Sequence, residues 1–326
     1  MYYLLGYKLL SKYPEDYGEN FSWKTSSKTK LSADRTFILT VDGDVQFEPD
    51  SVQQLVTELQ RDSNVGVACG RIHPMGSGVI VWYQRFEYAI THWLHKTAEK
   101  VMGVVLCTPG AFSMFRASAL MDHNIIKTFS REVGDGYSAI QSEQGEDRWL
   151  CSLLFQQGHR CEYVPAASAM THAPETLLEF FNQRRRWTVS TVVNQLDLLV
   201  KWRNSYHKNQ DISLSYLLFQ SLILLFTLIG PSYIILFLVY ANIGVFQLTL
   251  EEAYLGSIAP PLLYAVLCLV LARDSQVKVA RVLSVYYAIL SSLYFLFQSY
   301  SAADGSFSSP LALTVISMCA STVPVL

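Results

Sequence analysis

Charge is scarce in this chain of 326 residues: 16% of the residues are charged, whereas 51% are hydrophobic. From residue 212 to residue 250 there is no charged residue at all. The formal net charge of −2 is not the basic surplus of a protein whose main partner is a nucleic acid. The composition therefore argues against a nucleic-acid-binding class and indicates a globular part followed by a membrane part.

Paired cysteine motifs are also missing. The six cysteines form no C-x-x-C pair, and their spacing from the histidines is not that of a zinc site. We therefore expect free thiols, which suits a domain in the reducing cytosol. A secretory signal is not expected either, because Met1 to Leu10 has no basic start and no small-residue cleavage site.

What is present falls into three regions, with a globular domain over residues 1–173 and an arginine-rich amphipathic helix region over residues 174–211. Residues 212–326 hold apolar stretches close to the length that crosses a bilayer. The expected spans are about 212–240, 253–272, 282–303 and 306–326. Gly230-Pro231 leaves a kinked helix or a hairpin open for the first stretch. The positive-inside rule favours one crossing, since it places Glu251-Glu252 outside and Arg273, Lys278 and Arg281 inside.

A buried strand is predicted at Thr36 to Val41, because this run is apolar and rich in β-branched and aromatic residues. It ends in Asp42 and Asp44. Ligands of open α/β sheets bind at the carboxyl ends of strands, so the two carboxylates are candidates for a metal site. An ordinary Asp-Gly turn is the alternative interpretation of the same residues.

Two acids open a second element. Glu146 and Asp147 follow Gly145 at the start of a predicted helix that ends at Gly158. The helix dipole favours acidic residues in a first turn without any catalytic role. The flanking Arg148 and Trp149 favour a catalytic role for Asp147.

Other candidate contacts lie in predicted turns and loops. Gly70 to Pro74 is expected to be a loop after a strand, where Arg71 could meet a phosphate or a sugar. Pro109-Gly110 predicts a sharp turn with exposed backbone N–H groups before another strand. The aromatic helix predicted from Trp82 to Lys100 is expected to be a packing surface.

The arginine-rich helix is expected to have Pro174 in its first turn. One hypothesis places it on the lipid surface with its arginines against headgroups. The other takes Gln183, Arg186 and Trp187 as a Gln-x-x-Arg-Trp motif. Its indole would stack on a pyranose ring and its guanidinium would pair with phosphate.

Five short motifs occur together in the first two regions, and in their order and spacing they resemble those of chitin synthases, particularly the animal-type enzymes, which are processive family 2 glycosyltransferases. The motifs are Val-Asp-Gly-Asp (41–44), Ala-Cys-Gly-Arg-Ile-His-Pro (68–74), Thr-Pro-Gly-Ala-Phe-Ser (108–113), Gly-Glu-Asp-Arg-Trp-Leu (145–150) and Gln-Arg-Arg-Arg-Trp (183–187). The resemblance implies an α/β fold, part of a GT-A-type (Rossmann-like) domain, followed by transmembrane helices that line a polymer channel. It also implies a multi-pass membrane protein, expected in the plasma membrane, with a cytosolic catalytic domain.

The resemblance further implies an inverting transfer of N-acetylglucosamine from UDP-N-acetylglucosamine to the 4-hydroxyl end of a growing β-1,4 chitin chain. Asp44 and Asp42 would hold Mg²⁺ or Mn²⁺. Asp147 would be the general base, with Glu146 beside it. The donor and acceptor contacts would come from Gln183, Arg186, Trp187, Arg71, Pro109 and Gly110.

The chain departs from the family pattern at both ends. About 40 residues precede Asp42, too few for the βαβ units of a uridine site, and a Ser-Trp-Gly-Thr-type segment is not found near the end. We therefore expect a fragment that lacks the nucleotide-binding half and the C-terminal region, and that is not competent alone. A hyaluronan-type or cellulose-type synthase and a non-catalytic membrane subunit remain alternatives, and the oligomeric state stays open.

Overall fold

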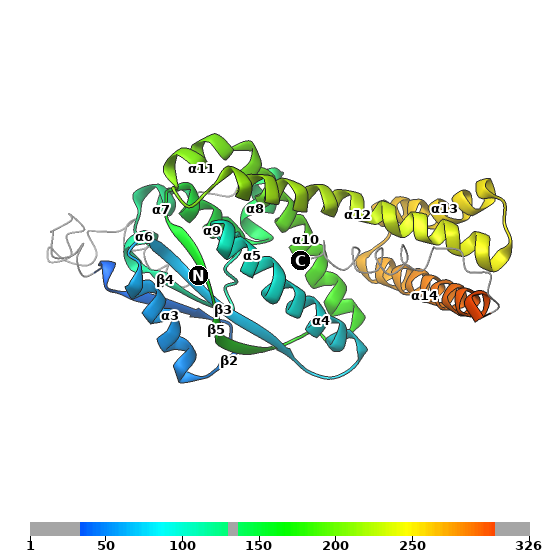
Figure 1. Cartoon of the computed structure of the whole chain (residues 1–326), viewed down its shortest axis with the longest axis horizontal. Coiled ribbons are helices and arrows are strands. Elements are labelled where there is room, and N and C mark those ends of the chain that lie inside the picture. The colour runs from blue at the N-terminus through cyan, green and yellow to red at the C-terminus, as the bar shows by residue number, and fades with distance from the viewer. Residues whose placement is uncertain (1–32, 130–135, 304–326) are drawn as a thin grey trace. The chain divides into compact units, whose positions relative to one another are not determined.

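The computed structural model of the chain describes residues 33–129 and 136–303. The chain divides into two compact units: unit 1 takes in residues 1–222, and unit 2 takes in residues 223–325. Unit 1 holds all the described strands and most of the helices, which Figure 1 labels along the chain.

The core of unit 1 is a five-stranded mixed sheet with the strand order β1-β4-β3-β5-β2. β3 and β5 run parallel, and the other neighbours are antiparallel. The strand predicted at residues 36–41 is present as β1, but it is an edge strand that is only partly buried, with Val41 exposed, and not the buried strand expected. The strands are β1 (Phe37–Val41), β2 (Gln46–Phe47), β3 (Val65–Met75), β4 (Phe112–Arg116) and β5 (Arg160–His172).

Helices cover both faces of this sheet (Figure 1). α3 packs on one face, while α5 and α9 pack on the opposite one. The helices of unit 1 are α3 (Pro49–Arg61), α4 (Val79–Ile90), α5 (Lys96–Met102), α6 (Ala117–Leu120), α7 (His123–Phe129), α8 (Tyr137–Glu143), α9 (Glu146–Gln156), α10 (Leu177–Val200) and α11 (Trp202–Lys208). A π-helical turn, η2 (Thr91–His95), joins α4 to α5.

Alternating side chains of the strands pack into two separate hydrophobic cores. In β3, Val67 belongs to the hydrophobic cluster that includes Phe155 of α9, whereas its neighbour Ala68 belongs to the cluster that includes Leu55 of α3. Successive residues of a strand point to opposite faces, so a strand segment covered on both sides is largely apolar. Residues 65–69 of β3 show this, since all five are buried.

β3 is longer than the sequence predicts, because Gly70 to Pro74 continues the strand instead of forming a loop. Its partner β5 accommodates this with a bulge, since Gly70 pairs with Val164 and Arg71 with Ser168. A Cβ at residue 70 would lie 2.5 Å from the Phe112 ring and 2.6 Å from the Ala167 carbonyl oxygen. The glycine at this position is therefore needed for close strand packing and does not mark a loop.

Helix α10 also begins later than predicted. It starts at Leu177, and Pro174 lies outside it. The Thr176 side chain accepts a hydrogen bond from the Glu179 N–H, and the Glu179 side chain accepts one from the Thr176 N–H. This capping box satisfies two N–H groups at the helix start, so it fixes the first turn without the proline.

The helical segment from α4 to α5 is not simply a packing surface. The side chains of Trp82, Phe86 and Trp93 are all more than half exposed. The opposite side of the same segment contributes to a cavity of unit 1. Three of the aromatic residues that suggested a packing surface are thus largely exposed.

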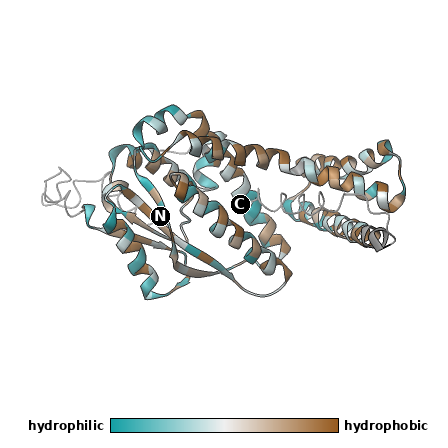
Figure 2. Cartoon of the chain, viewed as in Figure 1, coloured by the Kyte–Doolittle hydropathy of each residue, from teal (hydrophilic) through white to brown (hydrophobic). Residues whose placement is uncertain are grey.

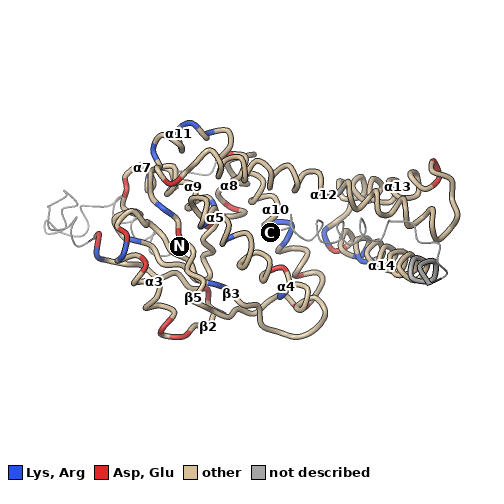
Figure 3. Tube along the Cα trace, in the orientation of Figure 1, with Lys and Arg blue, Asp and Glu red and all other residues tan. Residues whose placement is uncertain are grey.

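Unit 2 contains most of α12 (Leu214–Phe246), which starts in unit 1, together with α13 (Leu250–Val270) and α14 (Arg273–Ala303). Among the described residues, these are the three helices that are long and apolar enough to cross a membrane. Figure 2 shows their apolar character, and Figure 3 shows the long run without charge along α12. Gly230-Pro231 lies within α12, so the chain does not form a hairpin there. The stretch expected at 306–326 lies outside the described residues.

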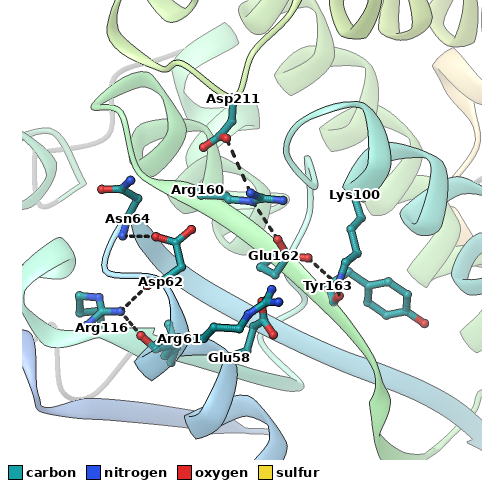
Figure 4. A network of polar contacts seen from close by, with 11 residues as sticks. Glu58, Arg61, Asp62, Asn64, Lys100, Arg116, Arg160, Glu162, Tyr163 and Asp211 are labelled. Carbon is teal, nitrogen blue, oxygen red and sulfur yellow. Dashed lines mark hydrogen bonds and ion pairs between the residues drawn. The ribbon is translucent and has the colours of Figure 1, made fainter.

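A buried ion-pair network links β5 to two neighbouring segments of unit 1 (Figure 4). The carboxylate of Glu162, whose side chain is 2% exposed, lies 2.8 Å from Lys100 Nζ and 2.8 Å from Arg160 Nε. Arg160 also reaches Asp211 at 3.7 Å. A buried carboxylate is tolerated only when it is paired, and this one has two cations.

Glu162→Ala should therefore destabilise unit 1. It removes the shared partner of two cations that are themselves only partly exposed, which costs about 1–3 kcal/mol in the free energy of unfolding. Chemical unfolding of the purified protein measures this. Glu58→Ala is the matched control, because Glu58 pairs with the largely exposed Arg61 and should cost under about 1 kcal/mol. An equal loss in both variants would contradict the assigned importance of the network.

Candidate active site

A cavity of about 300 Å³ opens in unit 1 where the ends of several elements meet. This volume is in the range of small-ligand pockets. Nine of the ten candidate site residues line it, and Arg71 does not. The nine are Asp42, Asp44, Pro109, Gly110, Glu146, Asp147, Gln183, Arg186 and Trp187.

Asp42 and Asp44 lie in the turn between β1 and β2. The Asp42 N–H donates to the Ala111 carbonyl oxygen at 3.3 Å, and the Val45 N–H donates to the Asp42 carbonyl oxygen at 3.1 Å. Asp44 Oδ2 accepts a hydrogen bond from Thr171 Oγ1 of β5 at 3.2 Å. The turn is therefore fixed by contacts to the segment before β4 and to β5.

Negative charge is concentrated at this turn. The pKa of Asp42 is raised by partial burial and by the neighbouring carboxylates of Asp44 and Asp147. A divalent cation would relieve this repulsion, so the residues fit a metal ion. No group of three or more His, Cys, Asp or Glu side chains suited to a metal occurs in the described parts of the chain. Two carboxylates fit Mg²⁺, which commonly takes its other ligands from water and substrate phosphates.

Asp147 projects from the first turn of α9. Its Oδ1 accepts a hydrogen bond from the Arg148 N–H at 2.7 Å, and its Oδ2 lies 3.9 Å from Cys107 Sγ. Burial is the main cause that raises the pKa of the Cys107 thiol, and the Asp147 charge adds to it. The thiol therefore stays protonated at neutral pH. Glu146, beside it, is exposed.

The start of α9 touches α10 at one very close point. Gly145 precedes the first turn of α9, and a Cβ at this position would lie 1.7 Å from Ser190 Oγ. Such a distance is impossible for a real side chain, so Gly145 allows the two helices to approach. The contact fixes Asp147 relative to the helix that carries Trp187.

Gln183, Arg186 and Trp187 share one face of α10 because residues three and four apart lie together on a helix. All three line the cavity, and Gln183 Oε1 has no hydrogen-bond partner in the described part of the protein. Arg184 does not line it. Its guanidinium is buried and pairs with Glu87 of α4. The three arginines are therefore not equivalent, and Arg184 cannot lie against lipid headgroups as the surface hypothesis assumed.

Arg71 is the one candidate that the structure places elsewhere. Its guanidinium lies over the ring of Trp93, 4.6 Å from the centroid. The expected loop at residues 70–74 would have left Arg71 free, whereas the observed strand alternates its side chains. Ile72 lines the cavity in its place.

Several lining residues were missed by the sequence analysis. Tyr88, His92 and Lys96 line the cavity from α4, η2 and α5. Their spacing of four is the signal that could have identified them, but Trp82, Phe86 and Trp93 dominated the pattern. His92 is buried, and its Nε2 accepts a hydrogen bond from the Ile72 N–H at 3.3 Å. Burial, followed by nearby cations, lowers the pKa of His92, so its ring is neutral.

A mixed sheet with helices on both faces, an acidic strand end and a helix-borne Gln-x-x-Arg-Trp motif define an α/β, GT-A-like glycosyltransferase domain. The comparisons with known proteins agree. The family described as "Chitin synthase" matches residues 28–304. The chain belongs to the chitin synthase family.

Curated relatives support the same assignment. The chain is 41% identical over 318 residues to chitin synthase chs-1 of Caenorhabditis elegans, covering 98% of this chain and 23% of the relative. It is 43% identical over 290 residues to a chitin synthase of Meloidogyne artiellia, covering 89% and 15% respectively. A chitin synthase of Aspergillus niger, csmA, is 34% identical over 176 residues, which is 50% of this chain and 11% of the relative. The chain thus spans less than a quarter of the length of these relatives.

The Gly145 contact gives a test of the site's geometry. Gly145→Ala should destabilise the protein by about 1–3 kcal/mol, because the new methyl group overlaps Ser190 and must separate α9 from α10. Thermal unfolding measures the loss. Ser190→Gly in the same chain should recover part of it, less the roughly 1 kcal/mol that a helical glycine costs. If Gly145→Ala is as stable as the parent, the two helices do not meet as described.

Proposed function

We propose that the protein transfers N-acetylglucosamine from UDP-N-acetylglucosamine to the 4-hydroxyl group of a growing β-1,4-linked chitin chain. The observation that carries the proposal is that an acidic pair, a separate carboxylate and an aromatic platform line one cavity, through Asp42, Asp44, Asp147 and Trp187. Membership of the chitin synthase family supports the choice of polymer.

Asp147 is the proposed general base. It takes the proton of the acceptor hydroxyl while that oxygen bonds to the anomeric carbon and the bond from that carbon to the diphosphate breaks. Attack from the face opposite the leaving group inverts the anomeric configuration. The neutral Cys107 thiol beside Asp147 does not compete as a base, because burial raises its pKa.

Asp42 and Asp44 are the proposed ligands of a Mg²⁺ or Mn²⁺ ion, which would neutralise the charge that collects on the leaving UDP. Their mutual repulsion supports this assignment. Arg186, on the same cavity wall, is placed to contact the diphosphate. An arginine suits that role because its planar group pairs with phosphate oxygens.

Trp187 and Gln183 are the proposed acceptor contacts. An indole face stacks on the apolar C–H face of a pyranose ring. The unpartnered Gln183 Oε1 suits a sugar hydroxyl as donor. A platform of this kind would retain the chain end between transfers, as processive synthesis requires.

The three apolar helices are proposed membrane spans, with the catalytic unit in the cytosol and the plasma membrane as the location. A single crossing by α12 places Glu251-Glu252 outside and Arg273, Lys278 and Arg281 inside, which follows the positive-inside rule. These helices would contribute to a path for the polymer. The oligomeric state is not part of the proposal.

The general-base assignment has a direct test in membranes that contain the protein. Asp147→Asn should lower formation of chitinase-sensitive polymer from radiolabelled UDP-N-acetylglucosamine by about 10²–10⁴-fold and leave donor binding unchanged. Asp44→Ala should instead remove the metal-dependent part of UDP binding. Parallel loss of binding in Asp147→Asn would assign that residue to the donor site. If UDP-glucose or UDP-glucuronate is a better substrate than UDP-N-acetylglucosamine in the same assay, a cellulose-type or hyaluronan-type synthase is favoured.

Trp187 separates the acceptor platform from an interfacial membrane anchor. Trp187→Ala should stop elongation while the protein stays in the membrane, because α12 to α14 are the proposed anchors. Trp187→Phe should be intermediate, since a smaller ring stacks on less of the sugar. Membrane partitioning and polymer synthesis are measured on the same preparations. Release of the alanine variant from the membrane, or normal polymer from it, would rule out the platform.

A further inference from the structure

We infer that Glu87 of α4 is a positioning residue for the acceptor platform and acts on Trp187 through Arg184. The inference rests on the proposed function of the cavity and extends it to a residue outside the cavity wall. Nothing in the sequence marks Glu87, because it lies in the middle of an aromatic helix with no motif around it. Its importance follows from contacts alone.

Glu87 and Arg184 form a buried ion pair. Glu87 Oε2 accepts a hydrogen bond from Arg184 Nη2, and the two side chains are 0% and 7% exposed. Burial raises the pKa of Glu87, and the Arg184 charge opposes that rise. Each group therefore compensates the burial of the other's charge, and the pair holds α4 against α10 at a defined point.

The guanidinium of Arg184 also contacts the ring of Trp187. The Arg184 guanidinium lies 4.6 Å from the centroid of the Trp187 ring and 4.8 Å from that of Phe180. These rings are three residues after and four residues before Arg184, so the guanidinium lies along the helix between them. A cation over an indole face is an attractive contact that also limits the ring's rotation.

The ion pair with Glu87 also restricts the Arg184 side chain. Arg184 is long and, without a partner, would have many rotamers. Glu87 removes that freedom from a second helix, so the guanidinium cannot follow the indole if the ring turns. Trp187 is thus held by one ring contact while it lines the cavity. Preorganised groups bind a sugar with less loss of entropy.

A second buried glutamate shows that such pairs need not serve a site. Glu162 is equally buried and is paired with Lys100 and Arg160, but none of these three residues lines the cavity. Figure 4 shows these three residues as part of a network around β5. Glu162→Gln is therefore a matched control for the loss of a buried, paired carboxylate.

The first experiment needs no substrate. The part of the tryptophan emission that disappears in Trp187→Phe is assigned to Trp187, and its quenching by acrylamide is measured in the full chain in detergent. Glu87→Gln should make this component roughly twofold more quenchable, whereas Glu162→Gln should leave it unchanged. Unchanged quenching in Glu87→Gln would overturn the inference whatever the protein's activity is.

The second experiment uses ligands. Glu87→Gln should weaken binding of chitohexaose roughly fivefold to tenfold and leave UDP binding unchanged, as expected for coupling between residues in contact. In a Trp187→Phe background the same substitution should change chitohexaose binding less than about twofold. Equal, additive losses in both backgrounds would contradict action through Trp187. If the parent protein binds neither ligand, the proposed function fails, and the quenching result still decides this inference.

A third variant covers the case in which Glu87→Gln does not fold. Glu87→Leu with Arg184→Met replaces the pair by apolar side chains of similar length, an exchange that is often neutral for stability. The folded double variant should show the same loss of chitohexaose binding and the same increase in quenching. Parental values for both would overturn the inference.

Discussion

The candidate site depends on one constraint: α10 must stay at a fixed rotation and height relative to the helices around it. Three contacts of polar side chains contribute to this constraint. Arg184 pairs with Glu87 of α4, Asp197 Oδ2 accepts a hydrogen bond from Gln156 Nε2 of α9 at 2.9 Å, and Ser190 lies against Gly145. Apolar contacts alone would tolerate sliding or rotation of a helix, whereas buried hydrogen bonds are lost when the helix moves. These contacts therefore keep Trp187 and Asp147 on the same cavity.

The parts of the site that could be predicted were those in which the local sequence decides the structure. The apolar, β-branched run from Phe37 to Val41 predicted a strand, and Asp42 and Asp44 follow it directly, so the acids had to lie at or just after its end. Gly145 and Gly158 bracket α9, so Asp147 had to be in its first turn. The helical spacing of Gln183, Arg186 and Trp187 placed them on one face. The order of the motifs then identified the family, although the roles of these residues stay predictions.

What could not be predicted depends on contacts between distant residues. Gly70 to Pro74 has a glycine and a proline, which locally favour a loop, but pairing with β5 extends the strand through both. The cavity-lining side of the segment from α4 to α5 was not predicted, because Trp82, Phe86 and Trp93 suggested a packing surface although they are exposed. Arg71 and Arg184 have the same chemistry as Arg186, and only the fold directs one to Trp93, one to Glu87 and one to the cavity.

Polar side chains also connect α10 to the start of the first apolar helix, α12. Gln195 Nε2 of α10 donates to Gln220 Oε1 at 2.8 Å, and Gln220 Nε2 donates to Glu99 Oε1 of α5 at 2.7 Å. Burial raises the pKa of Glu99, while the hydrogen bond from Gln220 opposes the rise. These contacts place polar groups in an apolar part of unit 1, where each unpaired group would be costly. Because α10 also carries Trp187, any rotation of α10 that moved this side chain would break this chain of hydrogen bonds as well. The first turns of α12 are thereby tied to the same helix that carries Gln183, Arg186 and Trp187 on the cavity wall.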